Sequence, residues 1–129
     1  MSNPAPITRA WRLEKSRKRL GSNNPRCFYC GETDVACLEL DHPVTEDLDP
    51  YFTQIVCRND HRKRELQRDV AGLTKNGRRG QKESKRLQLR RYLLLMAEHF
   101  DSMAAVSPDN IAAELRAAAS SLRRKAAEL

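Results

Sequence analysis

The chain has 129 residues, and its 24 Lys and Arg against 17 Asp and Glu give a formal net charge of +7. Charged residues make up 32% of the sequence and aromatic residues only 5%, so there is little material for one large core, and an enzyme built around a large apolar pocket is not expected. The length suits one domain, or one small module with helical extensions.

No segment of the sequence has the character of a membrane span or a secretory signal. The longest uninterrupted apolar run covers the six residues 92–97, whereas a helix that crosses a bilayer needs roughly 20. The first 20 residues hold six Lys and Arg and lack the apolar stretch that a signal peptide requires. We therefore expect a cytoplasmic protein with no membrane partner.

A basic arm of residues 1–25 opens the chain. Within it, Thr8 is a suitable N-cap for a helix that runs to about Leu20. Gly21, followed by Ser-Asn-Asn-Pro, is a stop signal. A short, strongly basic helix is therefore predicted.

Residues 26–73 form the predicted compact module. Residues 35–40 alternate in polarity as a strand does, and residues 51–56 are rich in aromatic and β-branched side chains. Asn59 or Asp60 can cap a helix that continues to about residue 73. The expected order is strand, strand, helix, which makes this an α+β protein.

A basic linker of residues 74–81 leads to two helices that we expect to pack as a hairpin over residues 82–129. The first runs from about residue 82 to 104, and the second begins with Ser107 as cap and Pro108 in its first position. Apolar residues recur every three or four positions on both helices, a pattern that also suits a homodimer or a larger assembly. The expected contact residues are Leu89, Leu93, Met96, Phe100 and Met103 on the first helix, and Ile111, Leu115, Ala118, Leu122 and Ala126 on the second.

Charge is divided unevenly along the chain. Seven Lys and Arg lie in residues 1–26 and thirteen in residues 58–91, whereas the segment between Cys27 and Cys57 has none and holds seven Asp and Glu. Carboxylates bind metal cations, and Lys and Arg bind phosphates, so this order predicts a cation site that faces nucleic acid. Both DNA and RNA fit this charge pattern. Solvated charged surfaces are the plainer explanation.

The sequence has four cysteines, Cys27, Cys30, Cys37 and Cys57. We interpret them as metal ligands rather than as two disulfides, because a reducing compartment disfavours disulfides. The spacing of Cys27 and Cys30 lets both thiolates reach one tetrahedral structural Zn²⁺, and Cys57 adds a third. Asp60 is the favoured fourth ligand, with Cys37, His61 or water as alternatives. A module of about 40 residues usually needs such a metal to fold, which argues against cysteines that are only small buried apolar residues.

Asp41, His42 and His61 form a second candidate constellation. Asp41 and His42 are neighbours in sequence at the predicted first strand, so their side chains are expected on opposite faces. One can bind a cation while the other reaches a water molecule, and His61 at the start of the predicted helix can complete the cation site. A neutral imidazole is suited to accept a proton from water. Ordinary strand-end and helix-cap roles are the alternative.

Over residues 27–67 these features together resemble the HNH endonuclease family, in its zinc-stapled ββα-metal form. The motifs that carry the resemblance are CFYC, LELDHP, the pair Asp49-Pro50 and CRNDH, in that order. The resemblance implies a metal-dependent endonuclease that hydrolyses phosphodiester bonds in DNA. It also implies that Asp41 and His61 bind the catalytic Mg²⁺, with Mn²⁺ or Zn²⁺ as alternatives, and that His42 is the general base.

Basic residues around His61 and in the linker are the expected phosphate ligands. They are Arg58, Arg62, Lys63, Arg64, Arg78 and Arg79. The sequence departs from the family pattern at three places. Asp60 stands where the fourth zinc cysteine is usual, Leu48 or Phe52 stands where the middle Asn is usual, and the acidic segment of residues 45–47 replaces the Gly-containing, often basic loop after the first His. The candidates to replace that Asn are Asp47, Asp49, Gln54 and Asn59.

Two other functions compete with hydrolysis. The first is a catalytically inactive HNH-like zinc module that binds nucleic acid or docks on a larger nucleoprotein assembly. The second is a small zinc-bearing regulator that binds another protein through the Leu, Met and Phe residues of the C-terminal helices.

Overall fold

The computed structural model describes residues 8–75 and 82–129. Within these ranges the chain forms four α-helices, one short 3₁₀ turn and one two-stranded sheet, in agreement with the predicted α+β class. The elements are α1 (Arg9–Leu20), η1 (Val35–Cys37), β1 (Leu38–Asp41), β2 (Gln54–Cys57), α2 (Arg58–Val70), α3 (Lys85–Ala104) and α4 (Asp109–Ala127). None of the described helices combines the length and the apolar character that crossing a membrane requires. Most of the predicted linker, including Arg78 and Arg79, lies outside the described residues.

The basic helix α1 begins and ends where the sequence predicts. Thr8 Oγ1 accepts a hydrogen bond from the Trp11 backbone N–H at 3.1 Å, which satisfies one of the free amides of the first turn. Gly21 adopts a left-handed φ of 72° and donates its N–H to the Arg17 carbonyl. Arg19 donates to the backbone carbonyl of Leu38 at 3.2 Å, so α1 is attached to the first strand.

The two strands pair antiparallel, with Leu38 opposite Cys57 and Asp41 opposite Gln54. Both strands are shorter than predicted. The first starts at Leu38 because Asp34 Oδ1 accepts from the Ala36 N–H at 3.0 Å and closes the turn η1. The second starts at Gln54 because Asp49 Oδ1 accepts from the N–H groups of residues 51 and 52 and holds them in a turn.

Helix α2 follows β2 without a loop, and its N-cap differs from the prediction. The cap is Cys57, whose Sγ accepts from the Asp60 N–H at 3.4 Å, rather than Asn59 or Asp60. The helix ends at Val70, three residues earlier than expected. Gly72 there adopts a φ of 72°, and the Leu73 N–H turns back to the Arg68 carbonyl at 3.0 Å.

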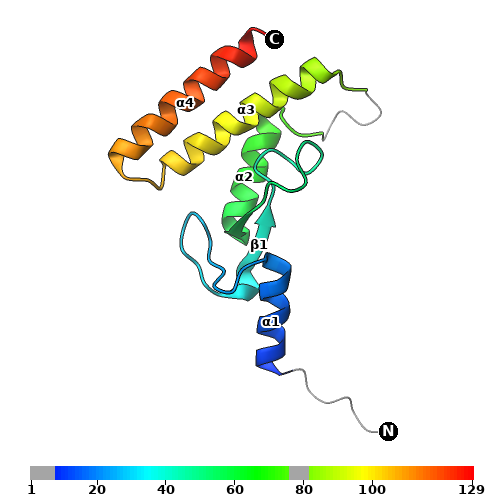
Figure 1. Ribbon diagram of the computed structural model, residues 1–129, viewed down its shortest axis with the longest axis vertical. Coiled ribbons are helices and arrows are strands. Elements are labelled where there is room, and N and C mark those ends of the chain that lie inside the picture. The colour runs from blue at the N-terminus through cyan, green and yellow to red at the C-terminus, as the bar shows by residue number, and fades with distance from the viewer. Residues whose placement is uncertain (1–7, 76–81) are drawn as a thin grey trace.

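Helices α3 and α4 form the predicted hairpin (Figure 1). Ser84 caps α3, so the helix starts at Lys85, three residues after the predicted start. Ser107 does not cap α4, because its Oγ donates to the Met103 carbonyl of α3 at 2.7 Å. The fully buried residues of α4 are Ala112, Ala119 and Ala126, which recur every seven positions. Small side chains let the two helices approach closely, so Ile111 and Leu89 of the predicted contact set stay exposed instead.

A second face of α3 packs on the central module, as Figure 1 shows, with α3 between α4 and α2. Leu95 is completely buried against Val44 and Leu73. His99, expected at the surface, is 9% exposed, and its ring meets that of Phe52 edge to face at 5.5 Å. A helix buried on two faces explains why its apolar residues do not form one simple stripe. Dimerisation through the hairpin stays a prediction.

Candidate functional site

Four metal-ligating side chains converge at the start of α2. The ligand atoms of Cys27, Cys30, Cys57 and Asp60 all lie within 4.8 Å of one another. The first two come from a tight turn in which the Gly31 N–H donates to the Cys27 carbonyl at 3.0 Å. Cys57 is the last residue of β2, and Asp60 lies in the first turn of α2. The group is close enough to hold one metal ion.

Asp60 is the fourth member of this cluster, as predicted. Its Oδ2 lies 3.2 Å from Sγ of both Cys27 and Cys57, and Cys30 Sγ lies 3.7 Å from Cys57 Sγ. The alternative prediction, in which Cys37 is the fourth ligand, is wrong. Its exposed thiol lies 3.8 Å from Asp34 Oδ2, outside the cluster, because the turn η1 directs it away.

The charges of the cluster favour a cation. Burial raises the pKa of the Cys57 thiol to about 12, so without a cation this thiol keeps its proton. Burial would also raise the pKa of Asp60, but hydrogen bonds from the Cys27 and Cys57 thiols outweigh it and hold that pKa below its usual value. A carboxylate surrounded by thiol protons is an arrangement in which a divalent cation can replace the protons.

A second site lies on the other side of α2, in a polar cavity of about 270 Å³. Its lining includes all three residues of the predicted catalytic constellation, Asp41, His42 and His61. His42 and Asp41 were expected on opposite faces of a strand, yet both line this cavity. The strand β1 ends at Asp41, so the alternation of a strand no longer applies to His42 and both residues reach the same cavity.

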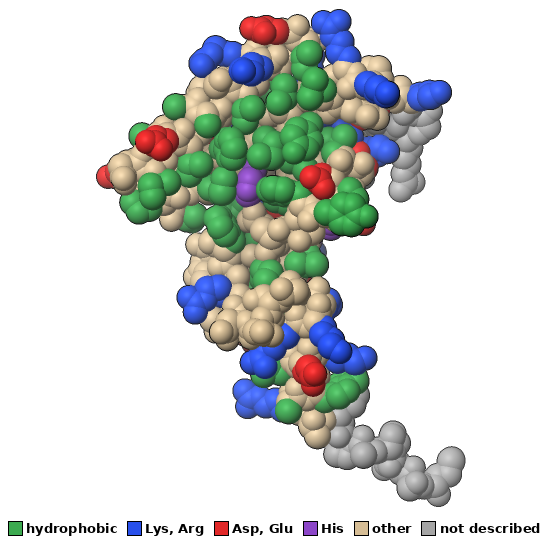
Figure 2. Space-filling model, in the orientation of Figure 1, with side chains coloured by type: hydrophobic (Ala, Val, Ile, Leu, Met, Phe, Trp, Pro, Cys, Tyr) green, Lys and Arg blue, Asp and Glu red, His purple; other side chains and the backbone are tan. Residues whose placement is uncertain are grey.

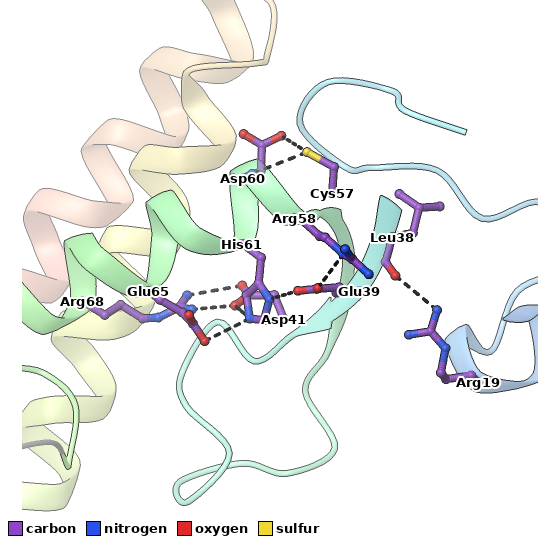
Figure 3. Close-up of polar contacts among 10 residues, drawn as sticks. All are labelled: Arg19, Leu38, Glu39, Asp41, Cys57, Arg58, Asp60, His61, Glu65 and Arg68. Atoms are coloured by element: carbon purple, nitrogen blue, oxygen red, sulfur yellow. Dashed lines mark hydrogen bonds and ion pairs between the residues drawn. The ribbon is translucent and has the colours of Figure 1, made fainter. Parts of the chain in front are cut away.

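The imidazole of His61 is held among three carboxylates (Figure 3). Its Nδ1 lies 2.6 Å from Glu39 Oε2, while its Nε2 lies 3.3 Å from Glu65 Oε1 and 3.6 Å from Asp41 Oδ1. The hydrogen bond with His61 lowers the pKa of Glu39, and the charge of Arg58 adds to this. The ring is therefore fixed at Nδ1 and presents Nε2 to the carboxylates of the cavity.

Glu39 and Glu65 were not predicted as site residues, although their spacing contains a signal. Glu39 lies two positions before Asp41 on the same face of β1. Glu65 lies four positions after His61, one turn along α2. Both relationships can be read from a sequence once the strand and the helix are placed.

Arg68 is the main surprise at this site. It is 8% exposed, and its Nη2 and Nη1 lie 2.5 Å and 3.3 Å from the two oxygens of Asp41, which is completely buried (Figure 3). The predicted ligand of the catalytic cation is thus paired with an internal cation. In residues 8–75 and 82–129, the Cys27 cluster is the one group of three or more metal-ligating side chains whose ligand atoms converge within 4.8 Å.

The four candidates for the missing Asn lie in different surroundings. Asp47 pairs with the buried Arg91 of α3, and hydrogen bonds from Arg91 and Thr45 outweigh burial and lower its pKa. Asp49 holds the turn before β2, and Asn59 is exposed. Gln54 lies opposite Asp41 in the sheet, and its buried amide nitrogen has no hydrogen-bond partner in the described part of the chain.

The predicted phosphate ligands on α2 are only partly available. Arg58 forms an ion pair with Glu39 at 3.2 Å. Arg64 lies over the Tyr29 ring, 4.3 Å from its centroid, and donates to Gln67. Arg62 and Lys63 are exposed.

Comparisons with protein-family models, with curated proteins and with solved structures found no match. The resemblance to HNH endonucleases therefore stays a prediction, which has to be argued from the two sites themselves.

Proposed function

We propose that this chain is a zinc-stapled module that hydrolyses phosphodiester bonds in DNA with the help of a divalent cation, in the manner of HNH endonucleases. One observation carries the proposal. Asp41 and His42 from the end of β1, and His61 from α2, line a single polar cavity of about 270 Å³. An acid and two imidazoles are the groups that metal-assisted hydrolysis needs.

The Cys27 cluster suits Zn²⁺ as its structural ion. Three sulfurs and one carboxylate oxygen form a tetrahedral donor set of the type that zinc accepts, and a bound ion would compensate the burial of Cys57 and Asp60. Such an ion would join the turn at Cys27, the end of β2 and the first turn of α2. Because His61 directly follows Asp60, it would also hold His61 in place at the cavity.

The surroundings of His61 suit a second cation. If Nδ1 donates its proton to Glu39, the lone pair of Nε2 faces Glu65 and Asp41 at 3.3 Å and 3.6 Å. Nε2 and the Glu65 carboxylate are donor atoms that a divalent cation could share, and the cation would have to compete with Arg68 for Asp41. A divalent cation bound there would neutralise the scissile phosphate and its leaving oxygen.

The other residues of the cavity then have distinct tasks. His42, half-buried at the cavity wall, would take the proton from the attacking water. Glu39 orients the His61 ring and fixes which nitrogen carries the proton, as carboxylates do behind metal-binding histidines. Arg68 compensates the charge of Asp41 while no metal is bound.

The test is nicking of supercoiled plasmid DNA by the full chain with Mg²⁺ or Mn²⁺. We expect His42→Ala to lower the nicking rate by about 100- to 10,000-fold, the usual contribution of a general base, with an unchanged thermal melt. Cys37→Ser, at an exposed thiol outside both sites, is the matched control and should nick at the wild-type rate. Equal nicking by wild type and His42→Ala would refute the role of His42.

A second function, nucleic-acid binding without hydrolysis, is favoured by the Arg68–Asp41 pair, because a buried guanidinium already occupies the carboxylate that would bind the cation. In that case the protein shifts DNA in a gel with an affinity that falls steeply with salt. It does not nick DNA with either metal, although the Cys27 cluster holds its ion.

A further inference from the structure

A groove separate from both sites lies between α1 and residues 32–36. Its volume is about 730 Å³, within the range of roughly 300–1,000 Å³ that is usual for ligand sites. It shares no lining residue with the cavity at Asp41. Figure 1 shows α1 at the end of the molecule opposite the α3–α4 hairpin, so the groove lies away from the surface on which α3 packs.

The α1 wall of the groove combines an exposed indole with three cations. Trp11 is 46% exposed, and Lys15 Nζ lies 4.6 Å from the centroid of its ring. Arg9 and Arg12 line the same wall. Their side chains form no ion pair within the described part of the chain, and the first turn of α1 contains no acid. Figure 2 shows Lys and Arg side chains around this end of the molecule, as well as over the hairpin at the opposite end.

The opposite wall is acidic, and its acids are engaged by the backbone. Glu32 Oε1 accepts from the Asp34 N–H at 2.8 Å, and Asp34 Oδ1 accepts from the Ala36 N–H at 3.0 Å. These bonds give the wall a defined shape. A polyanion in the groove would therefore keep its phosphates on the α1 side, where the charge is positive, and turn its other groups toward the acidic wall.

We propose that this groove binds single-stranded nucleic acid, with a base stacked on Trp11 and the neighbouring phosphates on Arg9, Arg12 and Lys15. An aromatic platform beside a basic track is the arrangement by which proteins hold single strands without reading their sequence. In a duplex each base is already covered by its neighbours, so the indole has no free base to contact. The inference depends on the proposed function only for its nucleic-acid partner, and it is independent of hydrolysis.

Trp11 is the only tryptophan of the chain, so tryptophan fluorescence reports on this groove alone. The full-length His42→Ala protein, without divalent cations other than the structural ion, is titrated with short oligo(dT), with oligo(rU), and with a duplex of the same length. We expect either single strand to quench Trp11 with saturation, at a lower concentration than the duplex. The affinity should fall with salt, and Arg9→Ala should reduce the slope of that dependence by about 0.7, the value for one phosphate contact on a single strand.

The role of the indole is tested by the anisotropy of a labelled oligo(dT). Trp11→Ala should weaken binding roughly 5- to 150-fold, which corresponds to one stacked base, whereas Tyr51→Ala, at a 93% exposed tyrosine outside the groove, should bind like the wild type. Unchanged Trp11 fluorescence at saturating oligo(dT), quenching by duplex at equal concentration, or equal affinity of the two variants would each overturn the proposal. Quenching together with no nicking by the wild-type protein supports the groove and refutes hydrolysis, whereas wild-type nicking without quenching supports hydrolysis and refutes the groove.

Discussion

Replacing Arg68 by Met is the most direct test of the electrostatics in the cavity. The change removes the guanidinium that lies 2.5 Å and 3.3 Å from the two oxygens of Asp41, and it keeps a long side chain to fill the space. Asp41 is completely buried, so its charge would lose its main partner without gaining water. Breaking a buried pair in this way costs about 3–5 kcal/mol, a large part of the 5–15 kcal/mol by which small domains are stable.

The measurement is urea unfolding followed by circular dichroism, at neutral pH and without added divalent metal other than the structural ion. We expect the unfolding free energy of Arg68→Met to fall by about 3–5 kcal/mol. The double variant Asp41→Asn with Arg68→Met should fall by less, because neither charge is then left unpaired. Arg116→Met, at an exposed position of α4, is the matched control, with an expected change below about 0.5 kcal/mol.

Divalent metal extends this test to the proposed function. If the cavity accepts a cation, Mn²⁺ can supply the charge that Arg68 provided, and at 100 times its dissociation constant it should return about 2.7 kcal/mol of stability to Arg68→Met. A loss below about 1 kcal/mol in the single variant, or a double variant as unstable as the single one, would refute a desolvated ion pair between Arg68 and Asp41.

Two further predictions concern the metal cluster and the buried histidine. Cys57→Ser, or removal of metal with a chelator, should unfold the central module while α3 and α4 keep much of their helical signal in circular dichroism. The control Cys37→Ser should retain the metal content and the melting temperature of the wild type. An unchanged melt after complete metal removal would contradict a structural role of the metal. For His99, burial lowers its pKa, so the unfolded chain takes up this proton at a higher pH than the folded chain, and stability should fall as the pH drops below about 6.5. The charged groups that face His99 are Asp41, which opposes this shift, and Arg64 and Arg68, which add to it. His99→Gln should flatten the decrease in urea unfolding free energy between about pH 7 and pH 5, and parallel pH profiles of the two proteins would be evidence against a buried neutral imidazole.

The position of Asp60 shows how far spacing along the chain can predict a site. In a helix that starts at Arg58, a residue three positions after Cys57 lies in the first turn, and its carboxylate returns to the Cys57 sulfur. Asp60 was predicted as fourth ligand from its position three residues after Cys57, although the helix was expected to start later, and its place in the cluster is confirmed. The prediction that Cys37 could replace it failed because the cap formed by Asp34 turns that segment away.

The boundaries of the helices and strands were also predicted correctly in some places and wrongly in others. Thr8 and Gly21 delimit α1 as expected, since caps act on amides within three or four residues. The predicted starts of β1, β2 and α2 were wrong. At each of these boundaries a side chain accepts a hydrogen bond from a backbone amide and changes where the element begins; the side chains are Asp34, Asp49 and Cys57. A sulfur acting as a helix cap is outside the usual cap preferences, which explains why Asn59 or Asp60 was favoured.

The amino-acid sequence by itself determined the basic helix, the approximate positions of the two short strands and the hairpin, because each depends on residues that are close in the chain or on a regular repeat. The four members of the metal-ligand cluster are up to 33 positions apart, and they were predicted from residue type and from the short spacings of Cys27 to Cys30 and of Cys57 to Asp60. Tertiary packing alone decided that Arg68 neutralises Asp41, that Arg91 of α3 reaches the loop at Asp47, and that His99 is buried against Phe52. These partners are 27, 44 and 47 positions apart. Which of the many arginines loses its water to meet a given carboxylate depends on how α2 and α3 pack in space, and no local spacing encodes that choice.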